Sequence, residues 1–123
     1  MSAYTMTPDE ALRSLQDSIK SAESRYGDNE IAFASERYVM CINIALGKIF
    51  SGIGREERVG TLRILFGRKP GFFVSSKDMT MAGASALRDR LFGPNAIVDG
   101  STTMKSDAVM GVKRAFELAT GRG

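Results

Sequence analysis

The segment from residue 29 to residue 50 constrains the fold more than any other part of the chain. Its apolar side chains are distributed around nearly the whole circumference of a helix, rather than along one stripe. A helix that is apolar all round needs cover on several sides. We therefore expect a helix capped by Asp28 or Asn29, which is either the central core helix or a dimer interface. The interface residues that we predict from it are Tyr38, Ile42 and Ile49.

The N-terminal segment predicts an amphipathic helix. Thr7, Pro8 and Glu10 have the spacing of a capping box, with proline at the first helical position. Apolar residues then recur at steps of three and four, which gives a single stripe for burial. Gly27 is the expected end of this helix.

Residues 55–75 are compatible with two structures. A helix over 55–66 would place its leucines on one face. Alternatively, strands over 61–66 and 72–75 would flank a turn that contains glycine and proline. Gly60 costs a helix about 1 kcal/mol, and β-branched and aromatic residues are common in both proposed strands. These two considerations favour the β-hairpin.

The rest of the chain predicts two further helices and one short strand. The first helix would begin at Ser76 or Asp78 and run to Phe92, where glycine and proline follow. A strand would cover 96–98. The final helix would be capped by a hydroxyl side chain within 101–103.

This order of elements, ααββαβα, predicts the fold class. We expect a helix-rich α+β domain with a small sheet based on the hairpin. If the hairpin segment is helical instead, the chain becomes an all-α bundle of about five helices. A length of 123 residues suits one domain over 1–123 with its own core. The ends, 1–6 and 121–123, are expected to be frayed.

Two features of the composition limit the chemistry that the chain can carry. It contains no histidine, the commonest general base and transition-metal ligand, and its single cysteine is Cys41. These residues cannot form a structural zinc site or an intramolecular disulfide. The glycines after Ser51 and the hydroxyl–lysine spacing of Thr102 and Lys105 are better explained as helix ends. We therefore predict no metal, no cofactor and no catalytic residue.

Charge is distributed unevenly along the chain. Residues 1–47 carry four basic and seven acidic residues, for a net charge of −3. Residues 48–123 carry thirteen basic and seven acidic residues, for a net charge of +6. Cations beside exposed aromatic rings are typical of proteins that bind single-stranded nucleic acid. The predicted nucleic-acid-binding residues, which neighbour three phenylalanines, are Arg55, Arg58, Arg63, Arg68 and Lys69.

Three functions are compatible with this sequence: an interaction or assembly protein, a small nucleic-acid-binding protein and an enzyme. The one we favour is a non-enzymatic interaction or assembly protein, a homodimer whose basic C-terminal half binds RNA or DNA. The alternative is a small enzyme with a histidine-free site of Arg, Lys and carboxylates. The longest apolar stretch, residues 38–46, is too short for a membrane helix of about 20 residues. The N-terminus lacks the pattern of a signal peptide, so we expect a cytoplasmic protein without a membrane partner.

Overall fold

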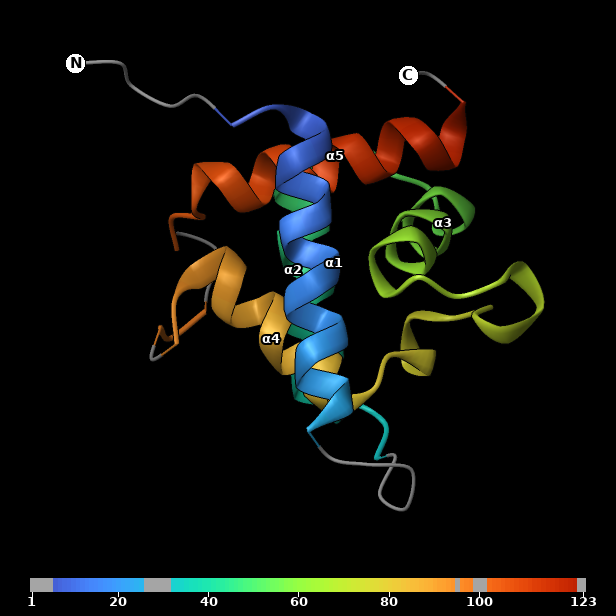
Figure 1. The fold of residues 1–123 in the computed structure, drawn as a ribbon, viewed down its shortest axis with the longest axis vertical. Helices are drawn as coiled ribbons and strands as arrows, with labels where there is room; N and C mark the ends of the chain where they lie inside the picture. Colours follow the sequence, from blue (N-terminus) through green and yellow to red (C-terminus); the bar gives the residue numbers. More distant parts are fainter. Residues whose placement is uncertain (1–5, 26–31, 95, 99–101, 122–123) are drawn as a thin grey trace.

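The computed structural model describes residues 6–25, 32–94, 96–98 and 102–121. This part of the chain is 72% helical and contains five α-helices and no strand or sheet. The predicted α+β fold is therefore wrong, and the alternative of an all-helical bundle fits (Figure 1). The helices are α1 (Pro8–Ser24), α2 (Glu36–Ile49), α3 (Arg55–Phe66), α4 (Met81–Phe92) and α5 (Ser106–Thr120), and two short 3-10 turns are η1 (Pro70–Phe72) and η2 (Ser76–Asp78).

Helix α1 has the capping box that its sequence predicts. The backbone N–H of Thr7 donates to Glu10 Oε1 (3.1 Å), and the N–H of Glu10 donates to Thr7 Oγ1 (3.2 Å). Pro8 is the first helical residue. The predicted end of this helix at Gly27 lies outside the described residues. The same is true of most residues of the two chain termini that we expected to be frayed. The buried stripe of the helix consists of Ala11, Leu12, Leu15, Ile19 and Ala22.

Helix α2 begins later than its apolar pattern suggests and is buried on one side only. Its N-cap is Ser35, and the caps predicted at 28 and 29 lie outside the described residues. The preceding residues, 32–34, form backbone hydrogen bonds with the chain before α4 and so are not helical. The fully buried residues of α2 are Ile42, Ala45 and Leu46.

Residues 55–66, the predicted first half of a hairpin, form helix α3. Glu57 Oε1 accepts a hydrogen bond from the N–H of Gly54 (3.1 Å) at its N-terminus, and Gly67 ends it with φ of 63°. Gly60, whose low helix propensity favoured the hairpin, faces α5. A Cβ there would lie 3.3 Å from the Cβ of Ala119. The glycine thus permits close packing of α3 on α5, and this packing outweighs a helix penalty of about 1 kcal/mol.

Neither of the other predicted strands forms. The segment 72–75 begins with the last residue of the turn η1, and its expected partner is helical, so it has no strand to pair with. Residues 96–98 are irregular. The later helices also begin further along the chain than predicted. Thr80 Oγ1 caps α4 by accepting a hydrogen bond from the N–H of Gly83 (3.1 Å), and α5 begins after Lys105.

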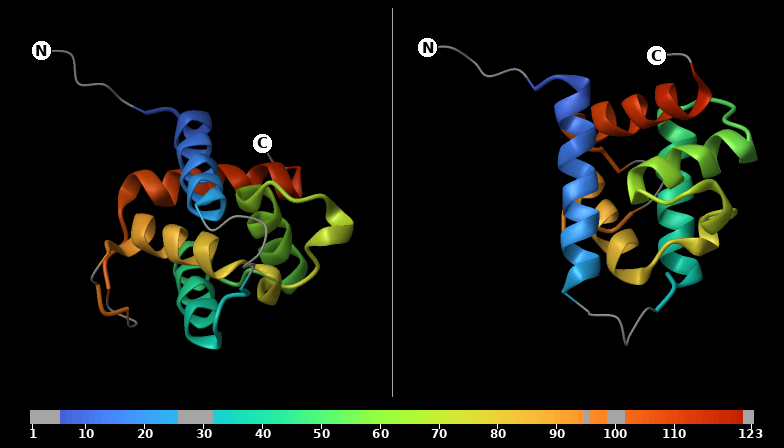
Figure 2. Two further views of the ribbon diagram at one scale, coloured as in Figure 1. Left: turned by 60° about the horizontal axis from the view of Figure 1, so that its bottom comes forward. Right: turned by 45° about the vertical axis from the view of Figure 1, so that its right-hand side comes forward.

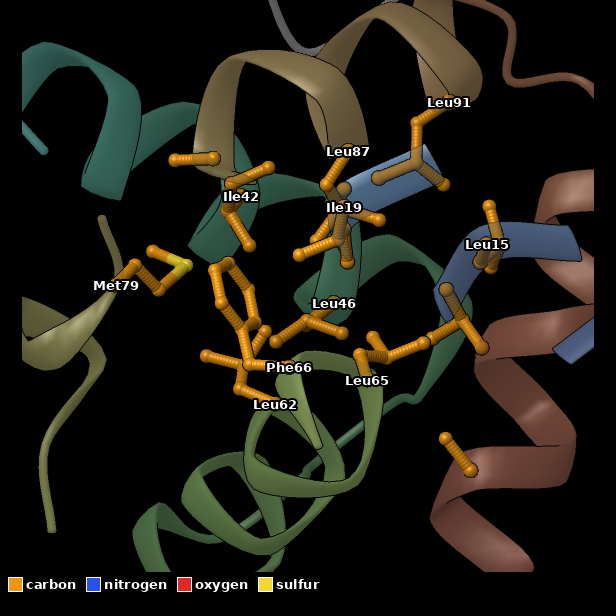
Figure 3. Packing of buried hydrophobic residues seen from close by; sticks show 14 of the residues in the cluster. Leu15, Ile19, Ile42, Leu46, Leu62, Leu65, Phe66, Met79, Leu87 and Leu91 are labelled. Atoms are coloured by element: carbon orange, nitrogen blue, oxygen red, sulfur yellow. The ribbon is translucent and has the colours of Figure 1, made fainter. Parts of the chain in front are cut away.

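The helices pack around one hydrophobic cluster to which all five contribute. Helix α1 packs against α4 and α5, α3 packs against α5, and α2 packs against α4. In Figure 1, α5 runs across the upper part of α1. Figure 3 shows how Ile19 of α1, Leu46 of α2, Phe66 of α3 and Leu87 of α4 converge in the centre.

Candidate protein interaction surface

Helix α2 lies at the edge of the bundle. In the left view of Figure 2 it is at the bottom, on the outer side of α4, and no other helix is drawn beyond it. Its outer face is nevertheless apolar. Met40 is 62% exposed, Ile44 is half-buried, and Phe33 in the segment before the helix is 64% exposed. Large apolar side chains gathered on one exposed face are typical of an interaction site.

The segment that carries Phe33 is fixed in place by the chain before α4. The N–H of Ala34 donates to the carbonyl of Met79 (2.9 Å), and the N–H of Met81 donates to the carbonyl of Ala32 (2.8 Å). This two-residue bridge, between Phe33 and Thr80, positions the exposed ring beside α2 and η2. The apolar face therefore extends from α2 onto the segment just before it, and residues of η2 form the opposite wall.

A groove of about 800 Å³ lies between these two walls. We call the groove and the apolar side chains that line it the α2 face. Asn43 also lines the groove. Its Oδ1 is buried and has no hydrogen-bond partner in the part of the chain that the structure describes. The lining residues are Phe33, Ala34, Glu36, Val39, Met40, Asn43, Ile44, Lys77 and Asp78.

The three predicted interface residues lie away from this groove. Ile42 is 0% exposed and belongs to the core of the single chain, so it offers no surface to a partner. Tyr38 and Ile49 are half-buried and pack against the same core cluster. The groove residues Phe33 and Met40 occur in the same apolar run, but the run alone does not indicate which side of the helix faces the core.

Two of the predicted nucleic-acid-binding residues have intramolecular roles. Arg63 donates from Nε and Nη2 to the carbonyl of Phe73, at 3.1 and 2.9 Å. Arg68 forms an ion pair with Glu23 and donates to the carbonyl of Phe66 (2.8 Å). These contacts hold the loop between α3 and α4 against the bundle.

The other three predicted cations differ in their environment. Arg55 and Lys69 are exposed. Arg58 is half-buried, and its Nε has no hydrogen-bond partner among the described residues. Of the neighbouring rings, Phe66 and Phe73 belong to the core, whereas Phe72 is 76% exposed. The structure therefore brings Lys69 and Phe72 together on one exposed loop, and leaves Arg63 and Arg68 beneath it as supports.

A second groove, of about 830 Å³, runs between α1 and α4 and carries charges of both signs. Glu10 and Asp17 are exposed, and Asp89 is half-buried. Arg90 is held in this groove by hydrogen bonds to the carbonyl of Ser14 (3.1 Å) and the hydroxyl of Ser18 (2.6 Å). The groove contains the residue types of a histidine-free site, and its carboxylates are exposed or half-buried.

Within the described ranges, neither a metal site nor a membrane helix is present. No three acidic, cysteine or histidine side chains there are grouped so that they could bind a metal ion. No helix in those ranges has both the length and the apolar character that crossing a bilayer requires. Comparisons of the chain with protein-family models, curated proteins and solved structures found no match.

Proposed function

We propose that this chain is a non-enzymatic assembly protein that forms a homodimer through the α2 face. The observation that supports the proposal is the exposure of Phe33 and Met40 on either side of an apolar groove. Large apolar side chains that lie together on an exposed face are typical of a surface that a partner covers. The single cysteine, Cys41, which cannot form a disulfide within the chain, agrees with the reducing environment of the cytoplasm.

The apolar area suggests a dimer of moderate affinity. Complete burial of a large apolar side chain is worth about 1.5–3 kcal/mol. Phe33 and Met40 are each roughly two-thirds exposed, so the four side chains of a dimer would contribute about 4–8 kcal/mol. Association costs about 4–15 kcal/mol in lost freedom. We therefore expect a concentration-dependent dimer, in which the remaining groove contacts supply the rest of the binding free energy.

The test is the molar mass in solution, measured by sedimentation equilibrium over a wide range of protein concentrations. We expect a mass that rises from that of the 13.3 kDa chain to twice that value. Met40→Glu should hold the protein at the lower mass, because the introduced carboxylate would be buried in the interface. Leu118→Glu is the matched control, since it places the same charge at an exposed apolar helix position on α5. A wild-type protein that stays monomeric throughout would refute the proposal.

A second candidate function, the binding of single-stranded nucleic acid, is favoured by the loop between α3 and α4. Phe72 projects from this loop with Lys69 three residues before it. Phe73 is buried and its carbonyl is bound by Arg63, so the ring of Phe72 is held outward before any ligand arrives. An exposed ring beside a cation can stack on a base and contact a phosphate, contributing about 1–3 kcal/mol for each stacked base.

Fluorescence anisotropy with labelled single-stranded RNA and DNA tests this second function. Phe72→Ala should weaken binding by about tenfold or more, the equivalent of a lost stacking contact. Lys69→Glu should weaken binding and reduce its salt dependence. Lys113→Glu, an exposed lysine on α5, is the control for a general loss of positive charge. If the control weakens binding as much as the two loop variants, the loop is not the binding site.

A further inference from the structure

The rim of the α2 groove carries charges of both signs. Glu36 lies in the first turn of α2, and Lys77 lies in η2 on the other wall. The neighbouring acid, Asp78, already accepts hydrogen bonds from the N–H groups of Val74 (2.8 Å) and Ser75 (3.1 Å). Glu36 and Lys77 are both exposed. The α2 wall therefore carries an exposed acid, whereas the η2 wall carries an exposed base and an acid that already accepts two backbone hydrogen bonds.

We propose that the α2 face binds the same face of a second copy about a two-fold axis, with Glu36 of each copy paired with Lys77 of the partner subunit. This inference rests on the proposed homodimer and specifies how the copies are oriented. A two-fold axis that lies in the plane of the interface, midway between Glu36 and Lys77, places each of these residues opposite the other residue of the second copy. One rotation therefore creates two equivalent ion pairs, one at each end of the interface.

The same rotation matches the apolar parts of the face. A two-fold contact requires one patch to carry both the projecting side chains and the hollow that receives them. The α2 face meets this requirement, because Phe33 and Met40 project beside the groove that they line. Each copy then offers an apolar side chain to the groove of the other. A partner carrying a single sign of charge would leave one side of the rim without a counter-charge, which favours a second copy as the occupant.

Exchange of the two charges tests this orientation. Glu36→Lys places two lysines opposite each other at both ends of the interface, and Lys77→Glu does the same with two glutamates. Each single variant should weaken the dimer about tenfold or more, since juxtaposed like charges disfavour association. The double variant, Glu36→Lys with Lys77→Glu, should dimerise like the wild type. A mixture of the two single variants should form a heterodimer, because every charge then faces its opposite. Circular dichroism confirms that each variant is folded.

The outcomes distinguish a failure of the two-fold pairing from a failure of the homodimer itself. A monomeric wild type overturns both. If Met40→Glu abolishes the dimer while the charge variants leave it unchanged, the homodimer stands and the two-fold pairing is wrong. The pairing is also wrong if the double variant remains as weak as the single variants, or if the mixed single variants fail to associate. Recovery in the double variant together with heterodimer formation supports the pairing.

Discussion

The crossing of α1 and α5 offers a sharp test of the fold, because it depends on the absence of one side chain. A Cβ placed on Gly111 would lie 2.7 Å from Leu15 Cδ1 and 2.8 Å from the carbonyl oxygen of Ala11. The leucine side chain could rotate away, but the carbonyl belongs to the backbone of α1. Gly111→Ala can therefore be accommodated only if the two helices move apart.

The expected magnitude follows from two opposing effects. Alanine is favoured over glycine inside a helix by about 0.5–1 kcal/mol. Forcing an extra carbon into a well-packed contact costs about 1–3 kcal/mol. Gly47→Ala in α2 separates these effects, because no atom lies within 4 Å of the position that its Cβ would take. We expect the free energy of unfolding to fall by about 1–2 kcal/mol for Gly111→Ala and to rise by about 0.5 kcal/mol for Gly47→Ala.

Urea unfolding followed by far-ultraviolet circular dichroism measures both values under the same conditions, at a low protein concentration that keeps association constant. The midpoint should move in opposite directions for the two variants, while the slope with denaturant stays the same. If Gly111→Ala is as stable as Gly47→Ala, the helices do not approach each other as closely as the structure indicates.

Three further substitutions test other contacts. Thr7→Ala removes the side-chain acceptor of the α1 cap and should lower the free energy of unfolding by about 1 kcal/mol in urea titrations. Arg63→Met removes both hydrogen bonds to the carbonyl of Phe73. Relative to the wild type, amide hydrogen exchange should become faster in residues 67–78 and stay unchanged in α1. Phe73→Ala should lower the melting temperature markedly, since removing a buried phenylalanine costs about 3–5 kcal/mol. Unchanged values for Phe73→Ala would mean that this ring is not in the core.

The parts of the fold that are predictable from sequence are those that depend on neighbouring residues. The capping box of α1 involves residues three apart, so its signal is complete within one turn. The nature of α3 depends instead on Gly60 meeting Ala119, a residue from the other end of the chain. Local propensities at 61–66 favour a strand, and packing against α5 overrides them.

The same distinction applies to the candidate surfaces. The excess of basic residues after residue 47 is visible in the sequence, but the partners of Arg63 and Arg68 are a carbonyl ten residues away and a carboxylate on α1. Because neither acceptor is adjacent to its arginine in the sequence, the sequence does not show which arginines are structural and which are exposed. Similarly, an all-apolar helix does not reveal which of its sides meets the core, and the outer position of Met40 depends on where α4 packs.

The packing of α1 on α5 also determines when the protein can finish folding. Asp9 and Arg114, joined by a 2.7 Å hydrogen bond at this crossing, are 105 residues apart. During synthesis, α1 leaves the ribosome long before α5 exists to cover it. The apolar stripe of α1 must therefore stay exposed, or pack provisionally on α4, until the last helix is complete. Chains that end before α5 would then be the species most prone to aggregation and proteolysis.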